Sequence, residues 1–238
     1  MDYTGWIDER GYREEDEEWL TPTSGIYIPN DSLQKHTALY REFIHAEQPL
    51  DFTNAFGLLG LDGEPVPAPE KITDWKLAQR KLASVVKLWD AIQSNDRKYL
   101  RKVIKWKKER SVMYDEGKDF WLLLEGVRPD GSRVKRGELI WPAYQYIEMR
   151  INHALDKYAA PRMVFTDDNE LKLRIRAKTL LGHMWLQVAD VVTYDMKERT
   201  CGWCGMPFQL DRNTRADRKW CSDSCRVSAS RQRRRTSK

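Results

Sequence analysis

All four cysteines of the chain lie between residues 201 and 225. They are Cys201, Cys204, Cys221 and Cys225, so two residues separate the first pair, sixteen separate the pairs, and three separate the second pair. Four thiolates at this spacing favour tetrahedral zinc, which we expect as one ion per chain. Two disulfide bonds are the alternative, but a thiol-reducing compartment disfavours them. Four thiolates leave no open position for a reactive water, so the predicted zinc is structural.

Local signals indicate how the chain would hold these cysteines. Gly205 follows the second cysteine and suits a tight knuckle, and Ser222 and Asp223 are good N-cap residues for a helix that carries the second cysteine pair. A knuckle, a hairpin and then such a helix form a treble-clef-like zinc finger. No histidine lies between Cys204 and Cys221, so the treble-clef nucleases, which use a histidine, are not supported.

Basic residues surround and follow the second cysteine pair. Residues 211–238 contain ten bases and three acids, a net charge of +7, whereas residues 1–30 contain eight acids and two bases, a net charge of −6. Because arginine and lysine bind phosphate, we predict contact with a nucleic acid, and DNA above RNA. The predicted contact residues are Arg212, Arg215, Arg218, Lys219, Arg226, Arg231, Arg233, Arg234 and Arg235. The alternative is a solubilising tail on a structural zinc clasp.

The rest of the chain is predicted to be mainly helical with one small β-hairpin. Apolar residues recur at three- and four-residue spacing over residues 72–108, 136–158 and 179–194, with a break near 94–96, and a further helix is expected over 32–47. In 171–177, Leu171, Leu173 and Ile175 alternate with basic residues, which predicts a hairpin strand with one buried face. Lysines and arginines among aromatics in residues 96–110 favour a helix with one solvated face, with a nucleic-acid surface as the alternative.

We therefore expect three parts: an acidic, weakly ordered segment at 1–24, a mainly helical domain at 25–196, and the zinc finger with its basic helix at 197–238. No apolar stretch approaches the roughly 20 residues that a membrane span needs. The start of the chain is acidic, unlike a signal peptide. These features predict a cytoplasmic protein without membrane contact.

The finger also resembles that of an uncharacterised bacterial and phage family, in which a helical N-terminal domain precedes a CGNR-like, treble-clef finger with four cysteines. The matching residues are Cys201, Cys204, Gly205, Phe208, Arg215, Asp217, Arg218, Trp220, Cys221, Ser222, Cys225 and Arg226, and LYREFIHAE and FTNAFGLLG are similar to the opening segments of the family. CGNR fingers have four residues within each cysteine pair and Gly-Asn-Arg after the last cysteine. This chain has two and three, followed by Arg226-Val227-Ser228. The resemblance implies a zinc-containing protein that contacts DNA.

Together these patterns favour a zinc-dependent nucleic-acid-binding protein, and above all a DNA-binding transcriptional regulator. A first alternative is a protein-interaction module in which the finger, or the helical domain, binds a protein partner. A second alternative is an enzyme with its site in the helical domain. Its only support in the sequence is that the acids Glu47 and Asp51 lie near His45. We expect no catalysis. Sequence specificity and oligomeric state stay open.

Overall fold

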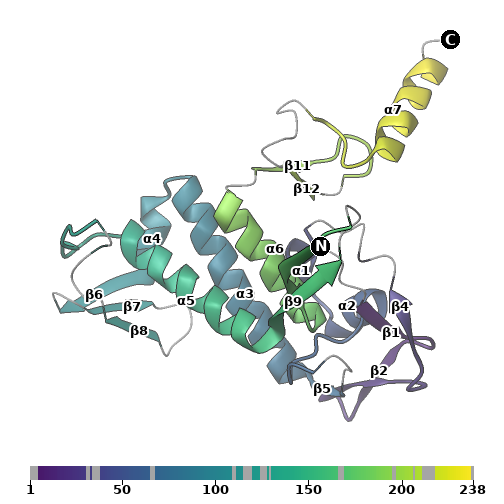
Figure 1. Cartoon of the computed structure of the whole chain (residues 1–238), viewed down its shortest axis with the longest axis horizontal. Coiled ribbons are helices and arrows are strands. Elements are labelled where there is room, and N and C mark those ends of the chain that lie inside the picture. Colours follow the sequence, from purple (N-terminus) through teal and green to yellow (C-terminus); the bar gives the residue numbers. More distant parts are fainter. Residues whose placement is uncertain are drawn as a thin grey trace.

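The protein is a mixed α/β chain in which helices form the body and small antiparallel sheets surround it (Figure 1). The computed structural model describes residues 5–30, 33, 38–64, 68–108, 111–114, 120–123, 128, 130–165, 169–194, 197–205, 207–210 and 218–236. The prediction of a mainly helical chain with one hairpin is confirmed for the long helices and the hairpin. It is corrected for the other strands described below.

Three long helices carry most of the core. They are α3 (Ile72–Gln93), α5 (Ile140–Tyr158) and α6 (Leu180–Tyr194), and they pack beside one another with the shorter α1 (Leu39–His45) and α2 (Pro49–Phe56) (Figure 1). Helix α6 is buried around nearly its whole circumference in its first half, as its apolar sequence predicts. Phe43 and Phe52 contact Trp75 edge-on, with ring centroids 4.8 and 5.9 Å from it, which joins α1 and α2 to α3.

The predicted break after α3 is confirmed, but the segment beyond it differs from the prediction. Helix α4 (Arg97–Val103) begins after Asp96, whose carboxylate accepts a hydrogen bond from the Tyr99 N–H at 3.0 Å. The helix then ends, and residues 104–108 form strand β6 (Ile104–Lys108), which pairs with β7 (Ser111–Tyr114), and β7 with β8 (Phe120–Leu123). Ile104 is β-branched and buried, and it opens a strand whose partners lie later in the chain.

The N-terminal acidic segment contains short strands within residues 5–24, which the expectation of weak order did not include. Strands β1 (Gly5–Asp8) and β4 (Tyr27–Asn30) pair with each other, and β2 (Tyr12–Glu15), β3 (Trp19–Pro22) and β5 (Glu70–Lys71) form a second sheet. Tyr12 and Leu20 are buried in the main core, while the acids of β2 stay exposed. The buried Asp8 carboxylate accepts hydrogen bonds from the backbone N–H groups of Ser24 and Gly25. The isolated apolar residues of this segment pack against residues much later in the sequence, and these contacts attach the segment to the body.

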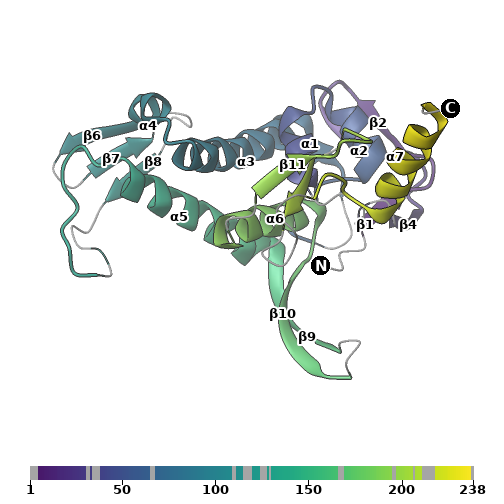
Figure 2. The same ribbon diagram turned by 90° about the horizontal axis from the view of Figure 1, so that it is seen from above.

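The predicted hairpin is present, but neither of its faces is buried by the body. Strand β9 (Ala159–Phe165) pairs in register with β10 (Leu171–Ala177), and Figure 2 shows this ribbon leaving the body as an arm. Its base is held where the Lys178 N–H donates to the Tyr158 carbonyl at 2.9 Å and where Ala159 is buried. The alternating apolar residues that were expected to face the core are exposed instead.

The C-terminal unit has a small core of its own. Strand β11 (Lys197–Thr200) pairs with β12 (Pro207–Leu210), and helix α7 (Asp223–Thr236) follows. Cys201 and Phe208 are buried against Trp220, Cys221 and Cys225 in a cluster separate from the main core. Within the residues described, no helix is long and apolar enough to cross a lipid bilayer.

Glu70 on β5 makes the stability of the body depend on pH. Its carboxylate is buried and accepts the N–H groups of Leu59 and Leu61, each at 3.0 Å. Burial raises the pKa of Glu70 to about 7 from an ordinary 4.5, and the N–H donors oppose this only in part. Between these two values the folded chain binds more protons than the unfolded chain, so stability falls as the pH rises.

We expect this group to cost the wild-type chain roughly 3 kcal/mol between pH 4.5 and pH 7. Glu70→Gln should lack that slope, although one of the two N–H donors then loses its acceptor. Denaturant unfolding of both chains at several pH values measures the difference. Parallel pH profiles of the two proteins would contradict the prediction.

Candidate metal centre

The four cysteines come together at the start of α7. Their sulfur atoms all lie within 4.8 Å of one another, with Cys221 Sγ 3.6 Å from Cys204 Sγ and 3.5 Å from Cys225 Sγ. No disulfide joins any of them. With zinc–sulfur bonds of about 2.3 Å, sulfur atoms around a tetrahedral zinc lie about 3.8 Å apart. The separation and the donor type therefore fit a metal ion bound by four thiolates.

Backbone contacts hold the first cysteine pair in position. The Gly205 N–H donates to the Cys201 carbonyl at 3.0 Å, and Gly205 has a φ of +72°, a left-handed conformation that favours glycine. This is the knuckle that the glycine after Cys204 predicts. The Gly202 N–H donates to the Lys219 carbonyl at 2.9 Å, which ties the knuckle to the segment that precedes the second pair.

The second cysteine pair is positioned by a helix cap. Helix α7 begins at Asp223, and the Ser222 hydroxyl accepts the Cys225 N–H at 3.2 Å, as an N-cap residue does. Cys225 lies in the first turn of the helix, and the N–H of Cys221 points at Cys201 Sγ from 3.4 Å. The sulfur atoms and the direction of α7 are therefore set by the same few residues.

The pKa values of two of the thiols are shifted in opposite directions. Burial raises the pKa of Cys201, but N–H groups of Cys204, Cys221 and Trp203 outweigh it and bring the pKa down to about 6. Burial and the three neighbouring thiols raise the pKa of Cys221 to about 12. N–H donors around a sulfur stabilise a thiolate, which is the form that binds metal.

The basic residues predicted to contact nucleic acid are described to different extents: some lie outside the described residues, and others are exposed or form an ion pair. Arg212 and Arg215 lie outside the described residues, and Arg233, Arg234 and Arg235 lie on α7 without a description of their side chains. Lys219 and Arg231 are exposed. Arg226 is exposed and forms an ion pair with Asp223 at 3.1 Å, across one turn of the helix.

Arg218 has partners within the finger itself. Its Nε donates to the Trp220 carbonyl at 2.8 Å and its Nη2 donates to the Cys221 carbonyl at 2.6 Å. Its guanidinium carbon also lies 5.7 Å from the centre of the Phe208 ring. The forked guanidinium thus braces the backbone that carries Cys221, which sequence reasoning did not anticipate.

We expect Arg218→Lys to weaken metal binding by about 10-fold, because lysine keeps the charge but does not reach both carbonyls. Competition with a chromophoric chelator measures this loss. Lys219→Gln, at the exposed neighbouring position, is the control and should leave the metal affinity unchanged. Equal metal affinity in Arg218→Lys and the wild type would show that Arg218 does not brace the site.

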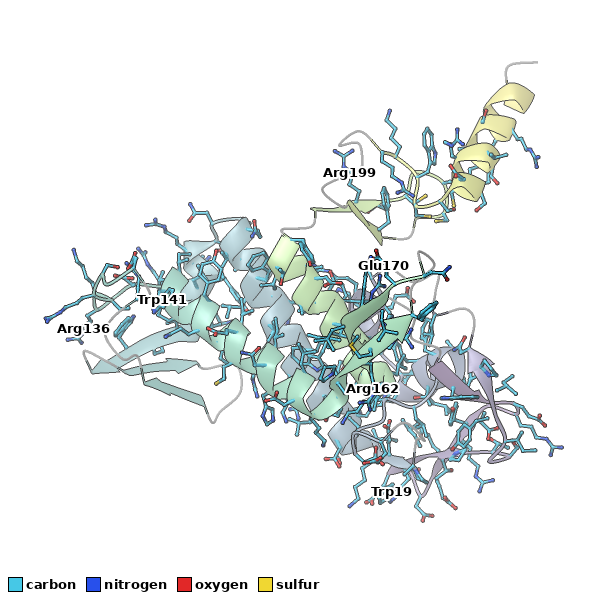
Figure 3. The ribbon with its side chains drawn as sticks, in the orientation of Figure 1. Trp19, Arg136, Trp141, Arg162, Glu170 and Arg199 are labelled. Atoms are coloured by element: carbon cyan, nitrogen blue, oxygen red, sulfur yellow. The ribbon has the colours of Figure 1, made fainter. Side chains whose placement is uncertain are left out.

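Two residues of the finger were missed by sequence reasoning. Trp203 is exposed at the knuckle, between the first two cysteines, and Arg199 extends from β11 as Figure 3 shows. An exposed aromatic ring is a group on which a nucleic-acid base can stack. The sequence did offer one clue to Trp203: a tryptophan between the two cysteines of the Cys-x2-Cys knuckle. The structure shows that this side chain is not part of the small core of the finger.

Two cavities of the helical body are lined by described residues, and several cations line each of them. The larger, of about 480 Å³, is lined by Arg97, Arg101, Trp141 and Tyr144, together with the ion pair of Arg128 and Glu138. The smaller, of about 280 Å³, is lined among others by Lys81, Arg150, His153, Lys157 and Asp74. Each holds one carboxylate among several cations. His45, Glu47 and Asp51 are exposed and line neither cavity.

No protein-family model, curated protein or solved structure matches this chain. The resemblance to the CGNR-like family therefore stays an expectation from the sequence.

Proposed function

We propose that the four cysteines bind one structural zinc ion and that the resulting treble-clef-like finger binds nucleic acid, most simply as a DNA-binding transcriptional regulator. The order of the elements supports the finger type: β11, the cysteine knuckle, β12, and then a helix that carries the last cysteine. The donor set supports zinc, because four thiolates favour it over harder ions.

One observation carries the proposal: the basic helix starts at the metal site. Cys225 lies in the first turn of α7, and Arg226, Arg231, Arg233, Arg234 and Arg235 follow it on that helix. A metal ion that holds Cys221 and Cys225 therefore also fixes the direction of the arginines. Preorganised cations lose less conformational entropy on binding than those of a flexible tail.

The position of α7 leaves it open to a long polyanion. Figure 1 shows α7 pointing away from the helical body, with the body on one side of the finger only. Asp223 is the one acid on the helix, and it lies at the N-terminal end, where the helix dipole favours a negative charge. The remaining charge along α7 is positive and suits the phosphates of a duplex groove.

The experiment is a mobility-shift titration of the zinc-loaded full chain against a DNA duplex and an RNA of equal length. It is run at about 50 mM and about 200 mM salt, with and without a zinc chelator. We expect binding that weakens steeply with salt and is lost on chelation. Absence of binding to both polymers at the lower salt would refute the proposal, and salt-insensitive association would favour a protein partner.

A further inference from the structure

The arm formed by β9 and β10 carries an uncovered apolar surface. Its register places Phe165 opposite Leu171 and Met163 opposite Leu173, with Ile175 opposite Pro161 on the same side of the ribbon. We call these six residues the apolar face. Its exposed fractions are 57% for Met163, 65% for Phe165, 61% for Leu171, 68% for Leu173 and 57% for Ile175.

The other side of the arm is strongly basic. Arg162 lies opposite Arg174, Lys172 opposite Val164, and Arg176 opposite Ala160. Figure 3 shows the position of Arg162 on the ribbon and of Glu170 at the start of β10, and Glu170 pairs with Lys172 at 2.7 Å. The two sides of the arm therefore differ completely in chemistry: one carries no charge, and the other carries four cations.

A ribbon of this kind is poorly stabilised by itself. An isolated two-stranded hairpin is marginal in water, and opposed like charges such as Arg162 and Arg174 weaken it further. Among the described residues, the main contacts of the arm with the body are those of β9 with α5 and of β10 with α6. The apolar face needs a cover to contribute to stability, because exposed apolar area gives no hydrophobic gain.

We propose that the apolar face of the arm is a dimerisation surface that docks on the apolar face of the arm of a second copy of this chain. An uncharged face can serve as its own complement in an isologous contact across a two-fold axis. Packed face to face, the two ribbons form a four-stranded sandwich with a dry layer between them. Both basic faces then turn outward, so their charges lie on opposite sides of the dimer.

The exposed area is sufficient for such a dimer. With more than half of each large side chain exposed, the apolar face offers roughly 600 Å² per chain, so two copies bury about 1,200 Å² in all. That value reaches the lower end of stable interfaces. The roughly 600 Å² of one chain is at the upper end of the range for the largest apolar patch on a monomer, and such patches are often functional. The contact between copies is independent of nucleic-acid binding by the finger.

Sedimentation equilibrium of the zinc-loaded full chain tests the proposal over a range of protein concentrations without nucleic acid. We expect a species of twice the chain mass of 28.1 kDa. Leu173→Asp and Leu173→Lys should each raise the dimer dissociation constant by about 100-fold or more, because either charge would be buried between the arms. Arg174→Gln, the next residue on the basic face, is the matched control and should stay dimeric.

A photoreactive residue at position 165 shows what the apolar face contacts. We expect a cross-linked product of two chains in which the bond maps to residues 159–177 of the second copy. Leu173 is largely exposed in the single chain, so circular dichroism of its variants should match the wild type, and Met163→Gln serves in their place if it does not. A monomeric wild type, dimeric Leu173 variants, or cross-links to the finger or body would each overturn the proposal.

Discussion

Replacing Arg231, Arg233, Arg234 and Arg235 with glutamine is expected to weaken DNA binding by about 100-fold or more at about 50 mM salt. Each cation that neutralises a phosphate releases about one counterion, so four lost contacts should reduce the slope of log affinity against log salt by about 3 to 4. Fluorescence anisotropy of a labelled duplex over a salt series measures both quantities. Zinc content should stay at one ion per chain, because the substitutions lie beyond the cysteines.

The matched control removes the same charge elsewhere. Arg97, Lys98, Arg101 and Lys102 lie on α4 and are exposed, so their replacement by glutamine changes the net charge equally. We expect this variant to bind DNA within a few-fold of the wild type, since screening limits distant charges to about 10 Å. Equal losses in both variants would contradict binding by the finger alone and would favour either a net-charge effect or the alternative nucleic-acid surface at residues 96–110. An unchanged salt slope in the α7 variant would contradict the assignment of the contacts to α7.

The second large effect is expected from Cys225→Ser. Serine removes one of four thiolates and the sulfur that lies 3.5 Å from Cys221 Sγ, so zinc affinity should fall by at least about 1,000-fold. In the part of the finger that the structure describes, the buried apolar residues are Cys201 and Phe208, a small core that we expect to need metal in order to fold. The arginines of α7 would then behave as a flexible basic tail with weaker DNA binding.

Elemental analysis, circular dichroism and DNA titration measure these losses, and Ser228→Ala, one turn along α7, is the control. The thermal transition of the helical body should be unchanged in Cys225→Ser, because its core is separate from that of the finger. One full equivalent of zinc held with wild-type affinity by Cys225→Ser would refute a four-thiolate site. Wild-type DNA binding by that variant would separate the metal from the nucleic-acid contact.

Local patterns predicted the parts of the fold that depend on neighbours in sequence. The apolar periodicity predicted α3, α5 and α6, and the break at 94–96 is present where Asp96 caps α4. The N-cap at Ser222 and the glycine knuckle at Gly205 were also predicted. Each of these features involves contacts within a few residues, which is the range that a sequence pattern reports.

Long-range contacts were not predicted. Tyr12 donates its N–H to the side chain of Asn54, and Leu20 pairs with Glu70 across the β3–β5 ladder, so the acidic segment is held by residues about 40 to 50 positions away. Nothing in the spacing of its aromatics shows those partners. Glu70 itself reads as an ordinary surface acid, yet it is buried where it accepts two backbone N–H groups.

For the candidate metal centre, the sequence by itself singled out the four cysteines that the structure brings together, because four cysteines at this spacing are typical of a metal site. It also determined the cap, the knuckle and the charge of the helix that follows. Only the tertiary structure decided what those groups touch. In the folded chain, Arg218 donates hydrogen bonds to the backbone carbonyls of Trp220 and Cys221, and Trp203 is exposed.

The same division holds for the arm. Alternation of apolar and basic residues determined a strand with two unlike faces, since side chains alternate along any strand. Whether the apolar face meets the core depends on where α5 and α6 direct the ribbon, and here they direct it away from the body. A sequence pattern records which residues share a face, whereas the packing of distant elements decides what that face is turned toward.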